Sequence, residues 1–314
     1  MTSAISWIKP DETAKEALVR ILTDRPFVVL PPPLHRLPLR VGNVVEIVGP
    51  SPSAKTLILT QAVVNCILPK EWKGVQYGGL ERAVLFVDLD CRFDVLSLSR
   101  ALELRITGGS TKGNKHEYDK ELFAACMRRF LYIRCYNSFE FLSILKTMHY
   151  RLQNERETQA TGVYMLMFDS IGAFYWMDRA LPSSSSGNNR KNLSLQSVAE
   201  TTVQEIQRLL LVHPMLVLVA KSASFSDKQS ISEVTRNSGK RQNTFDIRGP
   251  GNLTYRDYMP SVWQSFVTHR VLFRASDGNG KHQRHPTFST EWLLPSVKLS
   301  DNFTVNDDGL IVIL

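Results

Sequence analysis

The chain has 314 residues and a formal net charge of +8, from 38 Lys and Arg against 30 Asp and Glu. This length is enough for one large α/β domain with a substantial core. From the sequence we expect no signal peptide, and no apolar run approaches the ~20 residues that span a bilayer. The basic balance favours an acidic partner such as nucleic acid, although only 22% of the residues are charged and they are spread along the chain.

The cysteines Cys66, Cys91, Cys126 and Cys135 lack the C-x-x-C spacing of a zinc site. Three of them lie in apolar stretches. We therefore expect reduced cysteines of an intracellular protein, and neither a disulfide framework nor a zinc site.

Residues 1–40 are predicted to be an N-terminal lead-in that packs on the core. Residues 11–23 have the apolar spacing of one amphipathic helix, and the proline-rich stretch that follows excludes a second helix. Residues 41–314 are predicted to form the core itself, because alternating strand and helix patterns begin there.

The core pattern alternates apolar strands with helices. Strands are expected at 44–48, 83–88, 130–136, 163–169 and 215–220, and helices at 55–68, 94–106, 118–129, 139–154 and 193–212. Continuously apolar strands separated by helices are typical of a parallel sheet that is covered on both faces. After residue 266, short strands with turn signals predict an antiparallel extension at one edge of this sheet. The predicted fold class is therefore α/β.

Polar stretches at about 107–116, 181–192 and 222–258 interrupt the pattern and are predicted to be mobile. The last two follow the carboxyl ends of strands, where open α/β proteins bind ligands. Their basic residues are candidate contacts to DNA phosphates: Arg190, Lys191, Lys228, Arg236, Lys240, Arg241 and Arg248.

The stretch GPSPSAKT at 49–56 matches the phosphate-loop pattern G-x-x-x-x-G-K-[ST], except that alanine replaces the second glycine. Such a loop directs N–H groups at phosphates, its lysine at the outer phosphates and its threonine hydroxyl at magnesium. Pro50 and Pro52 remove N–H donors, and Ala54 would cost about 1–2 kcal/mol if its φ is positive. An ordinary strand-to-helix turn is the alternative. The predicted nucleotide-binding residues are Gly49, Ser51, Ser53, Ala54, Lys55 and Thr56.

Acidic residues end two of the predicted strands. Asp169 closes VYMLMFD and is the candidate acid that orders magnesium together with Thr56. Asp88 and Asp90 close AVLFVDLD and are candidates for the acid that positions the attacking water, or are ordinary solvated strand ends. The aromatic run 174–176 is either a stacking platform for bases or, as is more frequent, packs in the core or at a subunit interface.

The order of these motifs resembles the RecA/Rad strand-exchange ATPases. Over residues 40–275, the stretches CILPK (66–70), LFVDLDCRFDVL (85–96), FDSIGAFYWMDR (168–179) and YRDYMPSVWQSFVTHRVLF (255–273) are similar to a diverged paralogue of the eukaryotic recombinase. The resemblance implies a RecA-like ATPase core in a nuclear protein of homologous-recombination repair of DNA double-strand breaks. It also implies assembly with other recombinase paralogues, above all the D-type one.

Under this resemblance Asp90 lies where active recombinases have a catalytic glutamate, and the ranges 180–192 and 222–258 lie where the family has its DNA-contacting loops. The asparagine–glutamine pair that senses the γ-phosphate is replaced by Lys221 and Ser222. The N-terminal segment is too short for the lobe through which recombinases hold the next subunit.

We therefore expect a non-catalytic or weakly ATP-hydrolysing subunit that binds ATP, Mg²⁺ and DNA and is not a homo-oligomer. Two alternatives remain, an autonomous DNA-dependent ATPase with strand-exchange activity and a scaffold that binds no nucleotide.

Overall fold

The structure is a computed structural model that describes residues 13–16, 19, 27–108, 118–159, 162–180, 194–227, 253–275, 285–306 and 311–314. Within these ranges no helix is long and apolar enough to cross a membrane. The cysteines are free, and Cys91 is exposed whereas the other three are buried. The predicted DNA contacts lie outside the described residues: Arg190, Lys191, Lys228, Arg236, Lys240, Arg241 and Arg248.

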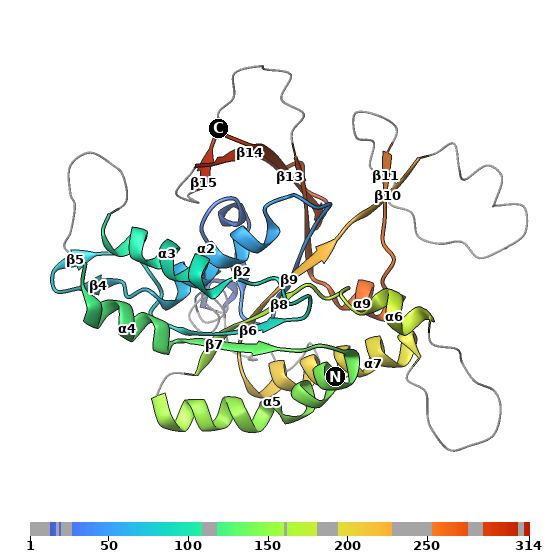
Figure 1. Ribbon diagram of the computed structural model, residues 1–314, viewed down its shortest axis with the longest axis horizontal. Helices are drawn as coiled ribbons and strands as arrows, with labels where there is room; N and C mark the ends of the chain where they lie inside the picture. The colour runs from blue at the N-terminus through green and yellow to red at the C-terminus, as the bar shows by residue number, and fades with distance from the viewer. Residues whose placement is uncertain are drawn as a thin grey trace, which may run out of the picture.

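A single large sheet organises the described chain, in the strand order β15-β14-β13-β12-β3-β9-β8-β6-β7 (Figure 1). Its parallel part consists of β3 (Val44–Gly49), β6 (Ala83–Asp88), β7 (Phe130–Arg134), β8 (Val163–Asp169), β9 (Leu216–Ser222) and β12 (His269–Ala275). The antiparallel extension consists of β13 (Thr287–Leu294), β14 (Ser300–Val305) and β15 (Ile311–Ile313). The predicted α/β fold, with an antiparallel C-terminal extension at one edge, is confirmed.

Helices cover both faces of the sheet. On one face lie α2 (Lys55–Ile67), α3 (Val95–Ile106) and α4 (Lys120–Arg128), and on the other α5 (Ser138–Gln159), α7 (Leu195–Val212) and α9 (Ser261–Phe266). Successive residues of a strand point to opposite faces, so in β6 Phe86 packs on the α2 side and Val87 on the α5 side. Because both faces are buried, the parallel strands have continuously apolar sequences.

Several short elements were not predicted. The glycine-rich stretch 72–79 contributes to a small hairpin of β4 (Glu71–Trp72) and β5 (Val75–Gln76). The range 222–258, expected to be without structure, begins and ends in a two-stranded ribbon of β10 (Ser224–Asp227) and β11 (Leu253–Arg256). Strands of only four residues carry little periodic signal, so this pairing depends on a partner strand that is distant in the sequence.

The described part of the N-terminal lead-in lies against the core. Its strands β1 (Phe27–Val28) and β2 (Leu39–Arg40) pair around a short 3-10 helix, η2 (Leu34–Arg36), and Leu30 joins the core cluster on the α2 face. The Arg36 Nε donates to Asp301 of β14 at 3.1 Å. Of the predicted helix 11–23, residues 14–16 and 19 are described and helical.

Candidate nucleotide site

The phosphate loop joins β3 to α2 at the carboxyl edge of the sheet. Gly49 lies so close to its surroundings that a Cβ there would meet the Phe273 carbonyl oxygen at 2.6 Å. Ala54, which replaces the second glycine of the motif, has a φ of 59° in the left-handed region. The loop therefore requires glycine at its first position and holds an alanine in a conformation that disfavours it by about 1–2 kcal/mol.

The Lys55 side chain folds back over its own loop. Its Nζ donates to the carbonyl oxygens of Gly49 at 2.8 Å and Pro50 at 2.9 Å, and to the Ser53 hydroxyl at 2.9 Å. Burial lowers the pKa of Lys55 to about 8, although the charge of Asp169 opposes this shift. The ammonium is thus held at the centre of the loop, where bound phosphates would have to compete with loop carbonyls. Ser51 is exposed at the tip of the loop.

Thr56 and Asp169 are brought together from α2 and β8. The threonine Oγ1 donates to an oxygen of the Asp169 carboxylate at 2.6 Å. Burial raises the pKa of Asp169 to about 6, against the effect of the Thr56 hydrogen bond. A hydroxyl and a carboxylate are hard oxygen donors that suit Mg²⁺. Because no group of three His, Cys, Asp or Glu among the described residues could hold a metal, phosphate oxygens and water would have to supply the other ligands.

The two acids at the end of β6 have different surroundings. Asp88 is fully buried and accepts hydrogen bonds from the Tyr132 hydroxyl at 2.7 Å and the Phe93 N–H at 3.3 Å, with Arg134 at 3.5 Å. Asp90 is half-buried, and its pKa is raised by burial and then by the charge of Asp88. Asp88 is therefore held by the fold and does not face solvent, which leaves Asp90 as the acid that could contact a water.

A cleft of about 480 Å³ lies beside the loop, between α2 and α3. This volume is in the range of small-molecule sites. The exposed cations Arg92 and Arg100 line it together with Thr56 and Ser97. These arginines were not predicted from the sequence, because they belong to no motif. They only follow the acidic end of β6, with Arg92 in the connecting segment and Arg100 in α3. The cleft can accept the nucleoside that accompanies phosphates on the loop.

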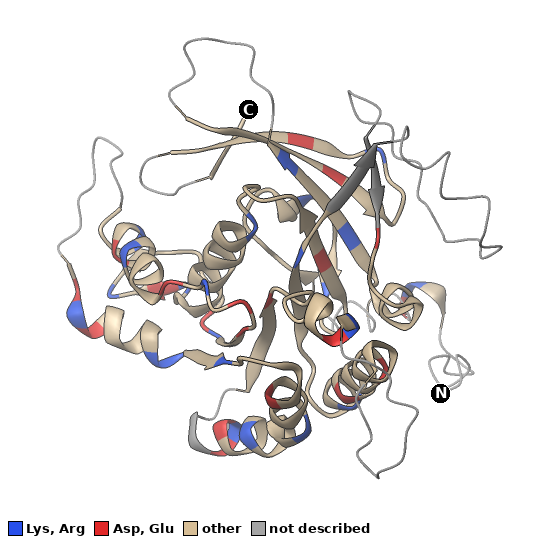
Figure 2. Cartoon of the chain, turned by 45° about the vertical axis from the view of Figure 1, so that its right-hand side comes forward, with Lys and Arg blue, Asp and Glu red and all other residues tan. Residues whose placement is uncertain are grey.

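Lys221, expected where recombinases sense the γ-phosphate, lies on the opposite face of the sheet from α2. Its buried Nζ is 2.9 Å from Glu46 of β3 and 2.9 Å from Asp257, which follows β11. Arg270 of β12 pairs with the same two acids at 2.5 and 2.9 Å, and Trp263 Nε1 donates to Glu46 at 2.8 Å. Figure 2 shows acidic and basic positions side by side on neighbouring central strands.

We call Glu46, Lys221, Asp257 and Arg270 the buried charge network. Burial alone would raise the pKa of Glu46, but the charges of Lys221 and Arg270 outweigh it and lower the pKa. The network connects the phosphate-loop strand to the end of the β10–β11 ribbon. Its residues are far apart in the sequence, so no local pattern could have found it. Ser222, the next residue after Lys221, is exposed and has only a short hydroxyl side chain.

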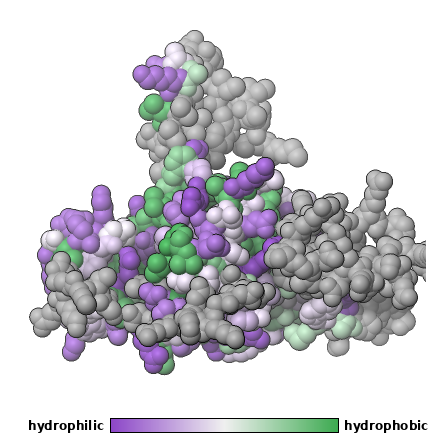
Figure 3. All heavy atoms as spheres, turned by 90° about the horizontal axis from the view of Figure 1, so that it is seen from above, coloured by the Kyte–Doolittle hydropathy of each residue, from purple (hydrophilic) through white to green (hydrophobic). Residues whose placement is uncertain are grey.

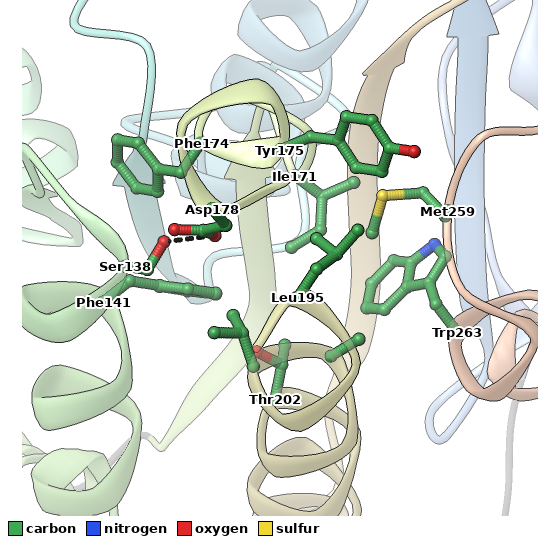
Figure 4. A pocket seen from close by; sticks show the side chains of 12 residues that line it. Ser138, Phe141, Ile171, Phe174, Tyr175, Asp178, Leu195, Thr202, Met259 and Trp263 are labelled. Atoms are coloured by element: carbon green, nitrogen blue, oxygen red, sulfur yellow. Dashed lines mark hydrogen bonds between the residues drawn. The ribbon is translucent and has the colours of Figure 1, made fainter. Parts of the chain in front are cut away.

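The aromatic run after β8 is divided by the fold. Phe174 and Tyr175 are buried and line a small cavity between α5, α6 (Tyr175–Ala180), α7 and α9 (Figure 4). The cavity holds about 30 Å³, which leaves room for no more than about two waters. Trp176, in contrast, is 63% exposed. Core packing is confirmed for Phe174 and Tyr175. For Trp176, base stacking and packing at a subunit interface stay predictions.

A mostly parallel α/β sheet, with a phosphate loop after β3 and an acid at the end of β8, defines a RecA-like protein. No family model matches the sequence. The chain is 46% identical over 337 residues to the DNA repair protein XRCC2 homolog of Arabidopsis thaliana, covering 97% of this chain and 89% of that protein. It is 29% identical over 269 residues to the DNA repair protein XRCC2 of Mus musculus, covering 86% and 84%. The chain belongs to the XRCC2 family of DNA repair proteins.

Proposed function

We propose that the chain is a subunit of a recombinase-paralogue complex that acts in the nucleus in homologous-recombination repair of DNA double-strand breaks. It binds ATP with Mg²⁺ and hydrolyses it weakly or not at all. The observation that carries this proposal is the phosphate loop, which keeps the Thr56–Asp169 contact while its lysine lies against loop carbonyls.

Binding is supported by the parts of the loop that are retained. Lys55 is available as a cation below about pH 8, and the adjoining cleft has the volume of a nucleoside site. Thr56 and Asp169 would hold the Mg²⁺, which would neutralise charge on the outer phosphates.

Weak hydrolysis is supported by the parts that are missing. Pro50 and Pro52 offer no N–H to a phosphate, and Ser222 has a side chain too short to replace a glutamine. Burial and the charge of Asp88 raise the pKa of Asp90, but its side chain is one methylene shorter than the glutamate of active recombinases and would hold a water in a different position. Loss of such positioned groups typically removes orders of magnitude in rate.

Titration of the full chain with a fluorescent ATP analogue and Mg²⁺, together with a DNA-stimulated turnover assay, tests this proposal. Lys55→Ala should weaken nucleotide binding by at least about 10-fold, since it removes a charge-assisted phosphate contact. Turnover should stay near background in both proteins. The matched control is Lys73→Ala, which removes an exposed lysine paired with Asp119 and Glu121 and should change neither quantity.

The alternatives give different results in the same assays. Robust turnover of the wild type that is lost in Lys55→Ala would identify an autonomous DNA-dependent ATPase. Absence of nucleotide binding by a folded wild-type chain would identify a scaffold.

DNA binding is proposed to use the basic residues of the ranges 181–192 and 222–258. Replacing Lys240, Arg241 and Arg248 together by glutamine should weaken binding to single-stranded DNA. It should also reduce the slope of log affinity against log salt by about 2, because each lost phosphate contact removes about 0.7. Measurement of affinity at several salt concentrations checks this. An unchanged slope and affinity would show that these residues do not contact DNA.

The proposed partners are the D-type recombinase paralogue and, through it, the other paralogues of the complex. Support comes from the family resemblance. On the face seen in Figure 3, described hydrophobic residues form small groups among hydrophilic ones. Non-obligate interfaces have the same mixed composition as ordinary protein surface, so this composition alone does not locate the contact.

A further inference from the structure

Trp176 is the exposed member of the aromatic run, and Met177 beside it is 55% exposed. Both lie on α6, which follows β8 and precedes the basic range 181–192. Figure 1 shows α6 close to α9, at the end of the molecule from which the β10–β11 ribbon projects. Helix α6 therefore lies near the described segments that border both proposed DNA-binding ranges, which are its own end at Ala180 and the β10–β11 ribbon.

Short contacts hold α6 in place beneath this ring. Tyr175 packs edge-on against Trp176 with centroids 4.9 Å apart, and it also packs edge-on against the ring of Tyr258, at 4.7 Å. Gly172 lies so close to Tyr258 that a Cβ there would collide with the tyrosine. The Asp178 carboxylate accepts a hydrogen bond from Ser138 of α5 at 2.6 Å (Figure 4). Trp176 is therefore presented on a fixed support, which lowers the entropy cost of binding through it.

Arg179 places a cation beside the exposed ring. Its guanidinium carbon is 5.6 Å from the Trp176 centroid, and Nη1 is 3.4 Å from the Tyr175 hydroxyl. Among the residues that the structure describes, Arg179 forms no ion pair with a carboxylate, and the neighbouring Asp178 is engaged with Ser138. Within the described part of the chain, the patch thus combines an exposed aromatic face with a positive charge that no carboxylate pairs.

This combination distinguishes between possible occupants. An apolar protein segment would gain from the ring but would bury the charge of Arg179 without a partner, which is costly. Single-stranded DNA offers both a base face for the ring and a phosphate for the guanidinium. Bases in a duplex are already stacked on both sides and offer no face to the tryptophan.

We infer that Trp176 stacks on an unpaired base of single-stranded DNA while Arg179 contacts a neighbouring phosphate. This inference rests on the DNA-binding part of the proposed function. It assigns a base contact, whereas the basic residues of the two ranges are proposed to contact phosphates only. The patch should therefore favour single strands over duplexes.

Fluorescence anisotropy of the full chain with a labelled oligothymidylate, and with a duplex of equal length, tests the inference. Trp176→Ala should weaken single-strand binding about 5- to 100-fold, the range found for loss of one stacked base. Trp176→Phe should recover most of this loss. Arg179→Gln should lower the salt slope by about 0.7, whereas Trp176→Ala should leave it unchanged.

The matched control is Tyr150→Ala, which removes another exposed aromatic ring, on α5, and should leave DNA binding unchanged. Circular dichroism and thermal melting establish that each variant is folded. The inference is overturned if Trp176→Ala binds single strands as the wild type does, or loses duplex binding equally. It is also overturned if the variant loses the paralogue partner while DNA binding is unchanged, which would make the patch a protein interface.

A folded wild-type chain that binds no DNA would overturn both the inference and the DNA-binding part of the proposed function. Nucleotide binding would then still be decided by the Lys55→Ala titration. Wild-type binding with no effect at Trp176 would overturn the inference alone.

Discussion

Ala54 occupies the position of the second glycine in the phosphate-loop motif. It adopts the left-handed conformation that the second glycine of the motif normally supplies. The loop therefore keeps a positive φ at this position, although it lacks the glycine that adopts this φ without a steric cost. Strain of this kind persists only where the surrounding structure holds it.

Ala54→Gly should raise the free energy of unfolding by about 1 kcal/mol, because glycine adopts this φ without the steric cost paid by alanine. Urea denaturation measures the change. The control is Ala101→Gly within α3, which should lower stability by about 1 kcal/mol since its backbone is helical. Equal destabilisation by both substitutions would show that Ala54 carries no strain.

Neighbouring residues at the end of β9 have different roles because a strand alternates its faces. Lys221 is fully buried on the α9 side, where it pairs with Glu46 and Asp257, and Ser222 is exposed. Lys221 is thus an interior lysine whose charge is paired within the sheet, on the face opposite to the phosphate-loop helix.

At the scale of elements, the buried charge network is the connection between the phosphate-loop strand and the ribbon. It joins β3, β9, the segment after β11, and β12. Removing one member of such a network leaves an opposite charge buried without compensation, and this is more costly than the pair itself is stabilising.

Asp257→Asn should therefore lower the free energy of unfolding by about 3–5 kcal/mol. The control is Arg274→Gln, which removes a partly exposed arginine of the same strand, β12, that is 3.5 Å from Glu291 and should cost less than about 1 kcal/mol. Urea denaturation of both variants measures the two losses in the free energy of unfolding. Similar small losses would mean that the network is not a stabilising unit.

A histidine pair joins α5 to the end of α7. The His213 Nε2 lies 3.0 Å from the His149 Nδ1. Burial, followed by the charge of His149, lowers the pKa of His213 below its ordinary value of 6.5. Between the lowered pKa of the folded chain and 6.5, the unfolded chain binds a proton that the folded chain does not. The contribution of His213 to stability is therefore fully present above pH 6.5, and it is lost as the pH falls below 6.5 toward the pKa of the folded chain.

Thermal melting from pH 7.5 to 5 should show this loss, and His213→Gln should make the melting temperature less sensitive to pH. The exposed His35 provides the control, because His35→Gln should leave the wild-type pH dependence in place. If His213→Gln melts with the same dependence as the wild type, other groups control acid stability.

At the scale of the whole molecule, we expect partner binding to be independent of the nucleotide site. Lys55→Ala removes contacts within the loop, whereas a specific interface buries about 1,600 Å² and does not depend on one side chain of this kind. The variant should thus form a one-to-one complex with the D-type paralogue as the wild type does, and the chain alone should be a monomer.

Co-purification of both proteins with that paralogue, followed by light scattering, measures association and stoichiometry. A folded Lys55→Ala chain that fails to associate would show that nucleotide is part of the interface. Self-association of the chain alone would contradict the predicted monomer, since a heterologous contact that repeats makes rings or filaments.

Local sequence was sufficient for most of the architecture. The run AVLFVD predicts β6 with the bounds that the structure has, because a strand buried on both faces needs apolar residues throughout. The sequence also predicted the phosphate loop, the acid at Asp169 and the family, since each depends on a pattern of neighbouring residues. The family and the α/β fold are confirmed, whereas the nucleotide and DNA contacts stay predictions.

What only the tertiary structure decided are the surroundings of individual side chains. Asp88 and Asp90 look equivalent in sequence, yet Tyr132 from the next strand engages one of them alone. Trp176 and Tyr175 are adjacent, yet only the tyrosine is buried, against Tyr258. Burial and pairing depend on residues that are distant along the chain and close in space, so no local pattern contains them.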